Sequence, residues 1–413
     1  PKKSRIRKMV RPHCALRLAR LLLMALSMCE VSEGFALTRS PDLLTSGLDK
    51  ICGRQKPPLT MSSFEQHEHG EMMQEEKAVT QKDKMFMQSG ANMNHITWDD
   101  DPYIFMFKDE SPGKIKMHMK SLDLHNWVRI DKTYKGQMLA RKKLYQTSMD
   151  DIFVSRTNSP KTEECKREFF RLLVDHLLQR FPEIFEKQTD GTILNRVTGE
   201  AVSTDMDSID EEDLLLRAGR LTQEDWIIME CDPEQQNMYV LTAGVLCFPS
   251  SWSLAEKFNS PMQSIHGPVK VYLDHMKDKV DSLFLRMKPD KSLWRANWGF
   301  YTSLDDTYDL FTHPRRKLHS FEGTSLPFEG EETGRKLFLR CEYQTLRKLP
   351  NSGCIVFGIR TYMRYLEDMK QRPTDEVQSL IHSIENLDRE YLSYKGGDIW
   401  KDAALKYLNS ILP

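Results

Sequence analysis

The clearest pattern of apolar and polar positions along the chain is an alternation in the segment KLFLRCEYQTL, residues 336–346. Successive side chains of a strand point to opposite faces of a sheet, so this alternation predicts a strand with two different faces. One face carries Leu337, Leu339, Cys341 and Tyr343, and the other carries Phe338, Arg340, Glu342 and Gln344. After the turn RKLPNSG, the apolar run CIVFGIRTYM predicts an antiparallel partner strand.

Three further runs, DWIIMEC, MYVLTAGVLCF and LWRANWGFY, also predict strands, and the turn DPEQQN separates the first two. In the last run, Trp294, Ala296, Trp298 and Phe300 share one face, and Arg295 and Asn297 share the other. Apolar residues at helical spacing predict helices over residues 162–185, where Pro182 stops or kinks the helix, over 269–287 and over 397–413. No glycine-rich phosphate loop follows a strand, and strands and helices do not alternate regularly. The pattern therefore predicts an α+β fold, an antiparallel sheet with helices packed on it.

The composition is that of an ordinary soluble protein with a real core. Of the 413 residues, 39% are hydrophobic and 29% are charged. The formal net charge is −1, so no overall field would attract nucleic acid or an anionic membrane surface, and nucleic acid is not an expected partner.

None of the eight cysteines forms a C-x-x-C pair, so zinc-ribbon, thioredoxin and ferredoxin spacings are missing. Cys231, Cys247, Cys341 and Cys354 lie inside apolar or alternating segments. We expect them to be buried thiols in a reducing compartment.

The first 37 residues are interpreted as a targeting segment. Residues 1–29 contain eight Lys/Arg and no acidic residue, and their apolar stretch, Leu21 to Met28, is too short to span a bilayer. No transmembrane segment is therefore expected in the mature protein. The sequence SEGFALTRS resembles the phenylalanine-containing junction of bipartite plastid-targeting sequences, with a mitochondrial presequence and an uncleaved tail as alternatives. Residues 38–92 are polar and rich in Met, Lys and Gln, which is typical of a disordered linker.

Two strands place polar side chains among aromatic and aliphatic ones. Arg340, Glu342 and Gln344 would share one strand face, and Arg295 with Asn297 would form a second polar stripe. A buried arginine needs a carboxylate partner or a bound anion. The residues therefore line a cavity or form a structural ion-pair network, and the sequence leaves both open.

His266 stands between Ile265 and the pair Gly267-Pro268, before a predicted helix. Glycine permits close approach of a ligand and proline stiffens the chain, which suits an axial ligand to a haem; a structural histidine is the alternative. Zinc is disfavoured because no second His or Cys lies at ligand spacing. Glu224 and Asp225 are candidates for a cap or for a carboxylate that pairs with an amine.

Six segments occur in this order along the chain: DKTYKGQMLARKKLY, LTQEDW, CFPSSWSLAEKFNSPMQSIHGPV, LWRANW, LRCEYQTLRKLPNSGCIVFGIRTY and YLSYKG. In these segments the chain resembles the haem-dependent oxidative N-demethylase family, whose α subunit carries haem in a PAS-like fold. The resemblance implies one domain over residues 93–396, followed by the C-terminal amphipathic helix 397–413.

The resemblance further implies b-type haem and oxidative removal of a methyl group from a small secondary amine such as dimethylamine, with dioxygen. His266 would be the iron ligand, and Arg295, Trp298 and Arg347 would contact the haem. Arg340, Glu342 and Gln344 would lie on the substrate side, with Glu342 orienting the amine.

The chain departs from the family in three ways. It has no dinucleotide or ferredoxin pattern, so a separate flavin or iron–sulfur reductase would supply the electrons. A paired arginine of the family is Arg347-Lys348 here, and Asn259 replaces a glycine. A haem- or ligand-sensing PAS-like protein without turnover, or a cofactor-free binding protein, are therefore the alternative functions.

Overall fold

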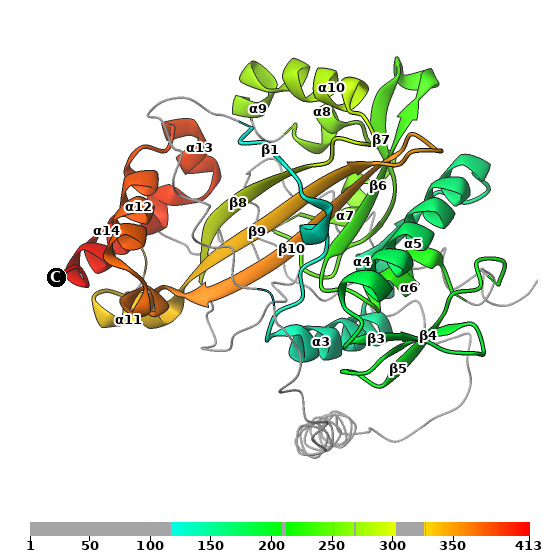
Figure 1. Cartoon of the computed structure of the whole chain (residues 1–413). Coiled ribbons are helices and arrows are strands. Elements are labelled where there is room, and N and C mark those ends of the chain that lie inside the picture. The colour runs from blue at the N-terminus through cyan, green and yellow to red at the C-terminus, as the bar shows by residue number, and fades with distance from the viewer. Residues whose placement is uncertain are drawn as a thin grey trace, which may run out of the picture. The chain divides into compact units, whose positions relative to one another are not determined.

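The computed structural model describes Asp99 and residues 117–208, 212–250, 252–267, 270–302, 326 and 328–413 (Figure 1). These residues belong to the second of two units into which the chain divides, residues 89–413. The predicted targeting segment 1–37 and the predicted linker 38–92 lie outside the described residues.

A seven-stranded antiparallel sheet forms the centre of the described part and confirms the predicted α+β class. Its order is β1-β8-β9-β10-β6-β7-β2. The strands are β1 (Lys120–Ser121), β2 (Phe153–Ser155), β6 (Asp225–Asp232), β7 (Met238–Val245), β8 (Leu293–Thr302), β9 (Leu337–Lys348) and β10 (Ile355–Tyr365). Every strand predicted from the apolar pattern is present.

A second, three-stranded sheet was not predicted. It consists of β3 (Phe185–Lys187), β4 (Thr192–Asn195) and β5 (Glu200–Ser203), paired antiparallel. Each strand is three or four residues long, too short to show an alternation.

The helices lie around the large sheet. They are α3 (Tyr134–Thr147), α4 (Met149–Ile152), α5 (Pro160–Arg180), α6 (Leu214–Gly219), α7 (Leu254–Lys257), α8 (Met262–Ile265), α9 (Lys270–His275), α10 (Lys277–Arg286), α11 (Glu331–Lys336), α12 (Thr374–Glu385), α13 (Arg389–Tyr394) and α14 (Gly397–Ser410), with 3₁₀ turns at Leu124–Asn126, Pro233–Gln235 and Leu366–Gln371. The prediction of one helix over 269–287 is wrong, because Met276 leaves helical geometry (φ −122°) and separates α9 from α10. The helices α5 and α14 were predicted.

One face of the sheet carries the even-numbered residues of β9, and we call it the site face. Its apolar part joins Ile227, Leu346 and Ile359 of the strands to Tyr272 of α9 and Phe284 of α10. The chain passes through α7–α10 between β7 and β8, and Figure 1 shows α8, α9 and α10 together beside these two strands. These helices therefore pack on the site face.

The other face, the back face, carries the odd-numbered residues of β9. Here Tyr343 and Trp226 belong to a larger apolar cluster that includes Tyr134 of α3, Phe169 of α5 and Trp400 of α14. The sheet thus separates two cores, so a residue's place in the strand alternation decides which core it enters.

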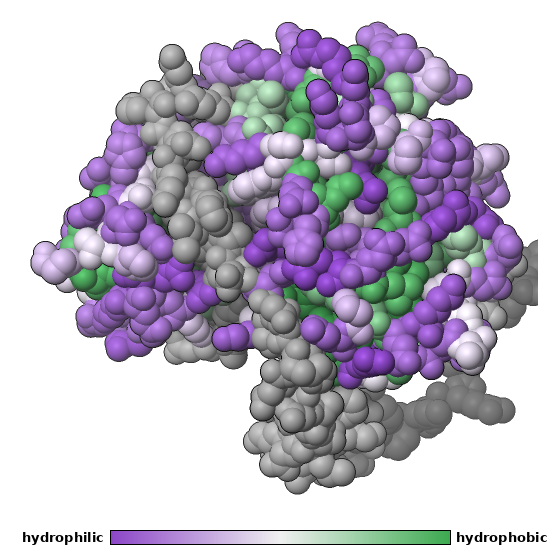
Figure 2. Space-filling model, viewed as in Figure 1, coloured by the Kyte–Doolittle hydropathy of each residue, from purple (hydrophilic) through white to green (hydrophobic). Residues whose placement is uncertain are grey.

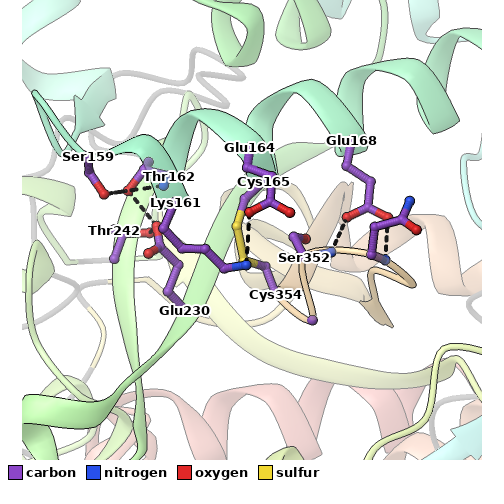
Figure 3. Close-up of a disulfide and its surroundings, with 12 residues drawn as sticks. Ser159, Lys161, Thr162, Glu164, Cys165, Glu168, Glu230, Thr242, Ser352 and Cys354 are labelled. Carbon is purple, nitrogen blue, oxygen red and sulfur yellow. Dashed lines mark hydrogen bonds and ion pairs between the residues drawn. A yellow bond between two sulfur atoms is a disulfide. The ribbon is translucent and has the colours of Figure 1, made fainter.

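A disulfide joins Cys165 of α5 to Cys354, which directly precedes β10 (Figure 3). The expectation that Cys354 is a reduced thiol is therefore wrong; its partner lies 189 residues away, where no local spacing could show it. Cys247 and Cys341 are buried thiols, as expected, whereas Cys231 is exposed. One turn along α5 from Cys165, Glu168 accepts hydrogen bonds from the backbone N–H groups of residues 351 and 352, at 2.7 Å each.

Hydrophilic side chains cover much of the face seen in Figure 2, with hydrophobic ones gathered between them. Among the described residues, the large apolar side chains that are exposed are Leu124, Leu273, Leu285 and Tyr394. No helix within the described ranges is both long enough and apolar enough to cross a bilayer.

Candidate functional site

The polar stripe predicted on two strands exists, and its two halves are adjacent. In the ladder between β8 and β9, Arg295 is opposite Gln344, Asn297 is opposite Glu342, and Gly299 is opposite Arg340. Directly opposed residues project to the same face of an antiparallel sheet. Arg340, Glu342 and Gln344 are all buried, so the stripe is not a solvated charged surface.

The Glu342 carboxylate is surrounded by donors. Oε1 accepts a hydrogen bond from Nε of Arg340 at 3.0 Å and lies 2.9 Å from Nη2 of the same guanidinium. Oε2 accepts from Nε2 of Gln344 at 2.8 Å and from Nδ2 of Asn297 at 3.2 Å. Burial alone would raise the pKa of this carboxyl, but the Arg340 charge and these hydrogen bonds outweigh it and lower the pKa below its ordinary value. Glu342 is therefore an anion at neutral pH.

From the sequence, a buried arginine needs either a carboxylate partner or a bound anion, and Arg340 has a carboxylate partner. Its carboxylate partner is Glu342, two positions along the same strand. The Nη2 group also donates to the backbone carbonyl of Phe248 at 2.6 Å and to Oγ1 of Thr361 at 3.1 Å. The guanidinium lies 5.7 Å from the ring centre of Tyr301. This arginine is held from several sides, which suits an anchor for Glu342.

The Phe248 carbonyl is itself fixed by Asp225, at the start of β6. The carboxylate of Asp225 accepts hydrogen bonds from the backbone N–H groups of Cys247 at 2.8 Å and Phe248 at 2.9 Å, and from Nη1 of Arg141 at 2.7 Å. Asp225 therefore caps the chain after β7 and pairs with Arg141, both fully buried. Of the two roles considered for Asp225, the structure supports the cap.

His266 follows α8 and is partly buried. Its Nδ1 lies 3.1 Å from the carbonyl of Met262, and its ring stacks on Tyr272 with 4.3 Å between ring centres. A carbonyl can only accept, so Nδ1 carries the hydrogen and Nε2 holds the lone pair. Burial is the main reason that the pKa of His266 falls to about 4, and the charges of Arg295 and Lys257 add to it against the hydrogen bond with Met262. The imidazole is thus neutral at pH 7, with Nε2 as a potential ligand atom.

Arg295 places a cation close to this imidazole. It acts electrostatically on His266, and it stands on the site face opposite Gln344. Its Nε is buried and has no hydrogen-bond partner among the described residues. A buried guanidinium N–H without an acceptor is unfavourable, so an anionic group at this position would be stabilised.

Two residues expected at the same site, Trp298 and Arg347, lie on the back face. Trp298 is opposite Cys341 in the ladder and packs against Phe300. The guanidinium of Arg347 lies 4.3 Å from the ring centre of Trp127. The sheet therefore separates both from Arg295 and Glu342.

Asn259, the position at which the resemblance implies a glycine, lies in the segment that leads to His266. Asn259 has φ 56°, in the left-handed region that glycine favours and asparagine tolerates better than most residues. Its Oδ1 also accepts a hydrogen bond from Nε of Arg156 at 3.0 Å. The turn after α7 therefore keeps a conformation that a glycine would also adopt.

The donor set fits a haem better than a protein-only metal site. Within the described ranges, no three His, Cys, Asp or Glu side chains come close enough to hold a metal ion. A neutral imidazole close to Ile265 and Tyr272 would hold a haem iron, and the buried, partnerless Nε of Arg295 would pair with an acidic side group of the haem.

Lys395 was not predicted as a site residue, although YLSYKG is one of the motifs quoted above. Its Nζ donates to Oδ1 of Asn297 at 3.1 Å and to the carbonyl of Trp298. These partners are about a hundred positions away in sequence, and no spacing pattern connects them.

A comparison with protein-family models gives a match over residues 118–405. The family is described as haem-dependent oxidative N-demethylase, alpha subunit-like. The match covers most of the chain and includes every site residue discussed above.

Proposed function

Because the chain belongs to the family of haem-dependent oxidative N-demethylase alpha-subunit-like proteins, we propose that it removes a methyl group from a small secondary amine such as dimethylamine. Dimethylamine, dioxygen, two electrons and two protons would give methylamine, formaldehyde and water. The single observation that carries this proposal is the His266 imidazole, which turns Nδ1 to the Met262 carbonyl and keeps Nε2 available as a ligand atom.

Bound b-type haem would supply dioxygen activation and the oxidising power for the amine. His266 would hold the iron through Nε2, with Nδ1–H donated to the Met262 carbonyl; such a second hydrogen bond is the usual way in which a ligating histidine is oriented. Arg295 would pair with a propionate, which supplies the acceptor that its buried Nε lacks.

Glu342 would face the cationic amine. The carboxylate has about four lone-pair sites, and protein donors already approach both of its oxygens. Asn297 makes the longest of these contacts, so an ammonium N–H would share the Oε2 side with it. Glu342 would then orient the amine as a fixed anion and would not take up its proton, since the carboxyl pKa is lowered.

The remaining parts of the proposal have indirect support. Numbered along the chain, the five long strands lie in the order 2-1-5-4-3, which supports a PAS-like sheet. An alpha-subunit-like family implies a partner, and we propose a separate reductase as the electron source. Import into a plastid, or into a mitochondrion, is proposed from the basic N-terminal composition and from the segment SEGFALTRS.

A second function is favoured by the same contacts around Glu342. A carboxylate whose neighbours compensate its charge can be purely structural, and the protein would then bind haem or a small ligand without turnover. The two functions differ in products. A haem sensor would show spectral shifts with CO, NO or dioxygen and release no formaldehyde.

The test is the absorption spectrum of the purified full chain, followed by an assay for formaldehyde with dimethylamine, dioxygen and a reductant. We expect a Soret band that disappears or shifts in His266→Ala and stays in the matched control His275→Ala, an exposed histidine at the end of α9. An unchanged Soret band in His266→Ala would show that another residue holds the iron. A Soret band without formaldehyde supports the sensor.

A further inference from the structure

Lys395, the residue that follows α13, is a cation without an acidic partner within the described residues. Its Nζ donates to Oδ1 of Asn297 at 3.1 Å and to the backbone carbonyl of Trp298. The ammonium also lies 4.7 Å from the ring centre of Tyr391 and 5.4 Å from that of Trp298. Carbonyl oxygens and aromatic faces thus hold this charge, and both favour a cation.

The backbone around Lys395 is fixed, which makes the position of the ammonium reproducible. The carbonyl of Lys395 accepts a hydrogen bond from Nε1 of the buried Trp400 at 2.9 Å. Gly396 follows with φ 72°, a left-handed conformation, and a Cβ on Gly397 would approach Cδ1 of Leu392 to 2.2 Å. The junction between α13 and α14 therefore depends on both glycines.

Lys395 and the Glu342 carboxylate, which can only accept hydrogen bonds, together determine which way the Asn297 carboxamide points. An ammonium group can only donate hydrogen bonds, so the carboxamide oxygen must face Lys395. The hydroxyl of Tyr391 lies 3.5 Å from the same oxygen. The carboxamide nitrogen must then face the other way, where it donates to Oε2 of Glu342 at 3.2 Å.

We propose that Lys395 is a positioning residue for Glu342 and acts through the Asn297 carboxamide. It holds the oxygen end of the carboxamide, which fixes the N–H donor against the carboxylate, so that Oε2 is held by Asn297 and Gln344 together. The inference rests on the proposed function in one respect, that the ligand which Glu342 orients is an amine.

A purely structural role for Lys395 makes different predictions. Among the described residues, the strand β1 pairs with β8 at Trp294 and Leu293. The Trp298 carbonyl is further along β8, and Lys395 could simply act as a hydrogen-bond donor to it. In that case the loss of Lys395 would lower stability and leave the ionisation of Glu342 unchanged. The two roles are therefore separated by a titration.

The experiment compares Lys395→Met and Lys395→Arg with the control Lys401→Met, a partly buried lysine of α14. The methionine side chain keeps the apolar stem against the rings of Tyr391 and Trp298. Glu342 is titrated in the full chain by ¹³C NMR of its carboxyl group, assigned by its absence in Glu342→Gln. Without Lys395 the carboxamide oxygen loses its cationic partner and the N–H donor is held less firmly against the carboxylate. The pKa of Glu342 should therefore rise in Lys395→Met and stay close to wild type in the other two variants.

Asn297→Leu tests the same link from the other side. It removes the donor, so the pKa of Glu342 should again rise, and adding Lys395→Met should raise it no further. The proposal would be overturned if the pKa of Glu342 stayed unchanged in Lys395→Met or in Asn297→Leu. It would also be overturned if the pKa shifts of the two single variants added up in the double variant. The second result would mean that the Lys395 charge acts directly and not through Asn297.

Turnover provides the readout that depends on the proposed function. In Lys395→Met we expect kcat/KM for dimethylamine to fall about tenfold, the effect of losing one hydrogen bond to a charged group, with the acidic limb of its pH profile moved to higher pH. The proposed function would be refuted if the wild-type protein showed no Soret band and released no formaldehyde. The NMR titration of Glu342 would still decide the role of Lys395.

Discussion

The disulfide between Cys165 and Cys354 should contribute much of the stability of the described domain. Because it closes a loop of 189 residues, the chain-entropy relation gives about 5 kcal/mol at 25 °C, near the upper end of what disulfides contribute. At about 2 °C per kcal/mol for a domain of this size, the melting temperature should fall by roughly 10 °C when the bond is absent.

The assay is thermal unfolding of the full chain with and without reductant, beside Cys165→Ser, Cys354→Ser and the control Cys231→Ser, an exposed thiol. The reduced wild type and both disulfide variants should melt at the same lower temperature, and reductant should not change the variants further. Denatured wild type should also show two fewer thiols before reduction than after it.

The site should be less sensitive than the fold to this bond. Arg340 pairs with Met363 in the ladder between β9 and β10, several residues from the turn that Cys354 closes. Glu168 also keeps its two hydrogen bonds to that turn after reduction. The reasoning is refuted if reductant leaves both the melting temperature and the thiol count unchanged, because the two sulfurs would then not be bonded.

Three further predictions concern the core and the site. Glu342→Gln leaves the Arg340 charge buried without its carboxylate, so we expect unfolding in denaturant to show a loss of about 3–5 kcal/mol and formaldehyde production to collapse; full activity would contradict the amine-orienting role. A Cβ on Gly358 would lie 2.6 Å from the ring of Trp226, so Gly358→Ala should destabilise by roughly 1–3 kcal/mol in the same assay, whereas Gly136→Ala in α3, with open space around it, should not. Burial lowers the pKa of His176 from 6.5 to about 4, so between these two pH values the unfolded chain binds more protons than the folded one. The free energy of unfolding should therefore fall as the pH drops from 6.5 to 4. In denaturant titrations at several pH values, His176→Phe should reduce this dependence on pH.

The sequence predicts the large sheet well because strand alternation is a local property. Arg340, Glu342 and Gln344 share a face simply because they are two positions apart, and the structure confirms it. The same rule places Trp298 on the other face of the sheet from Arg295. The expectation that both residues contact one cofactor therefore conflicted with the alternation itself. Trp298 and Arg347 were expected at the cofactor because they lie in the segments that resemble the family. Proximity in sequence does not show on which face of the sheet a side chain lies.

The sequence does not show the contacts between distant segments, which form only when the chain folds. The partner of Cys354, the cap that Asp225 places on Cys247 and Phe248, and the contact of Lys395 with Asn297 each join segments with no shared period. The break between α9 and α10 is a similar case. The apolar positions continue through Met276 at helical spacing, and only the backbone geometry at that residue interrupts the helix.

These long-range contacts also explain how the separate motifs of the family act on one carboxylate. Hydrogen bonds run without interruption through the following groups: Arg141, Asp225, the backbone of Cys247 and Phe248, Arg340, Glu342, Asn297 and Lys395. Cations and anions alternate along the buried part of this chain, so removing one member leaves its neighbour's charge uncompensated in a medium of low dielectric. The direction of the Glu342 carboxylate is consequently set from both ends, by Arg141 of α3 through the Phe248 carbonyl and by Lys395 beyond α13 through Asn297. A site built in this way holds an anion in one orientation before a ligand binds, which is the property that the proposed orienting of a small cation requires.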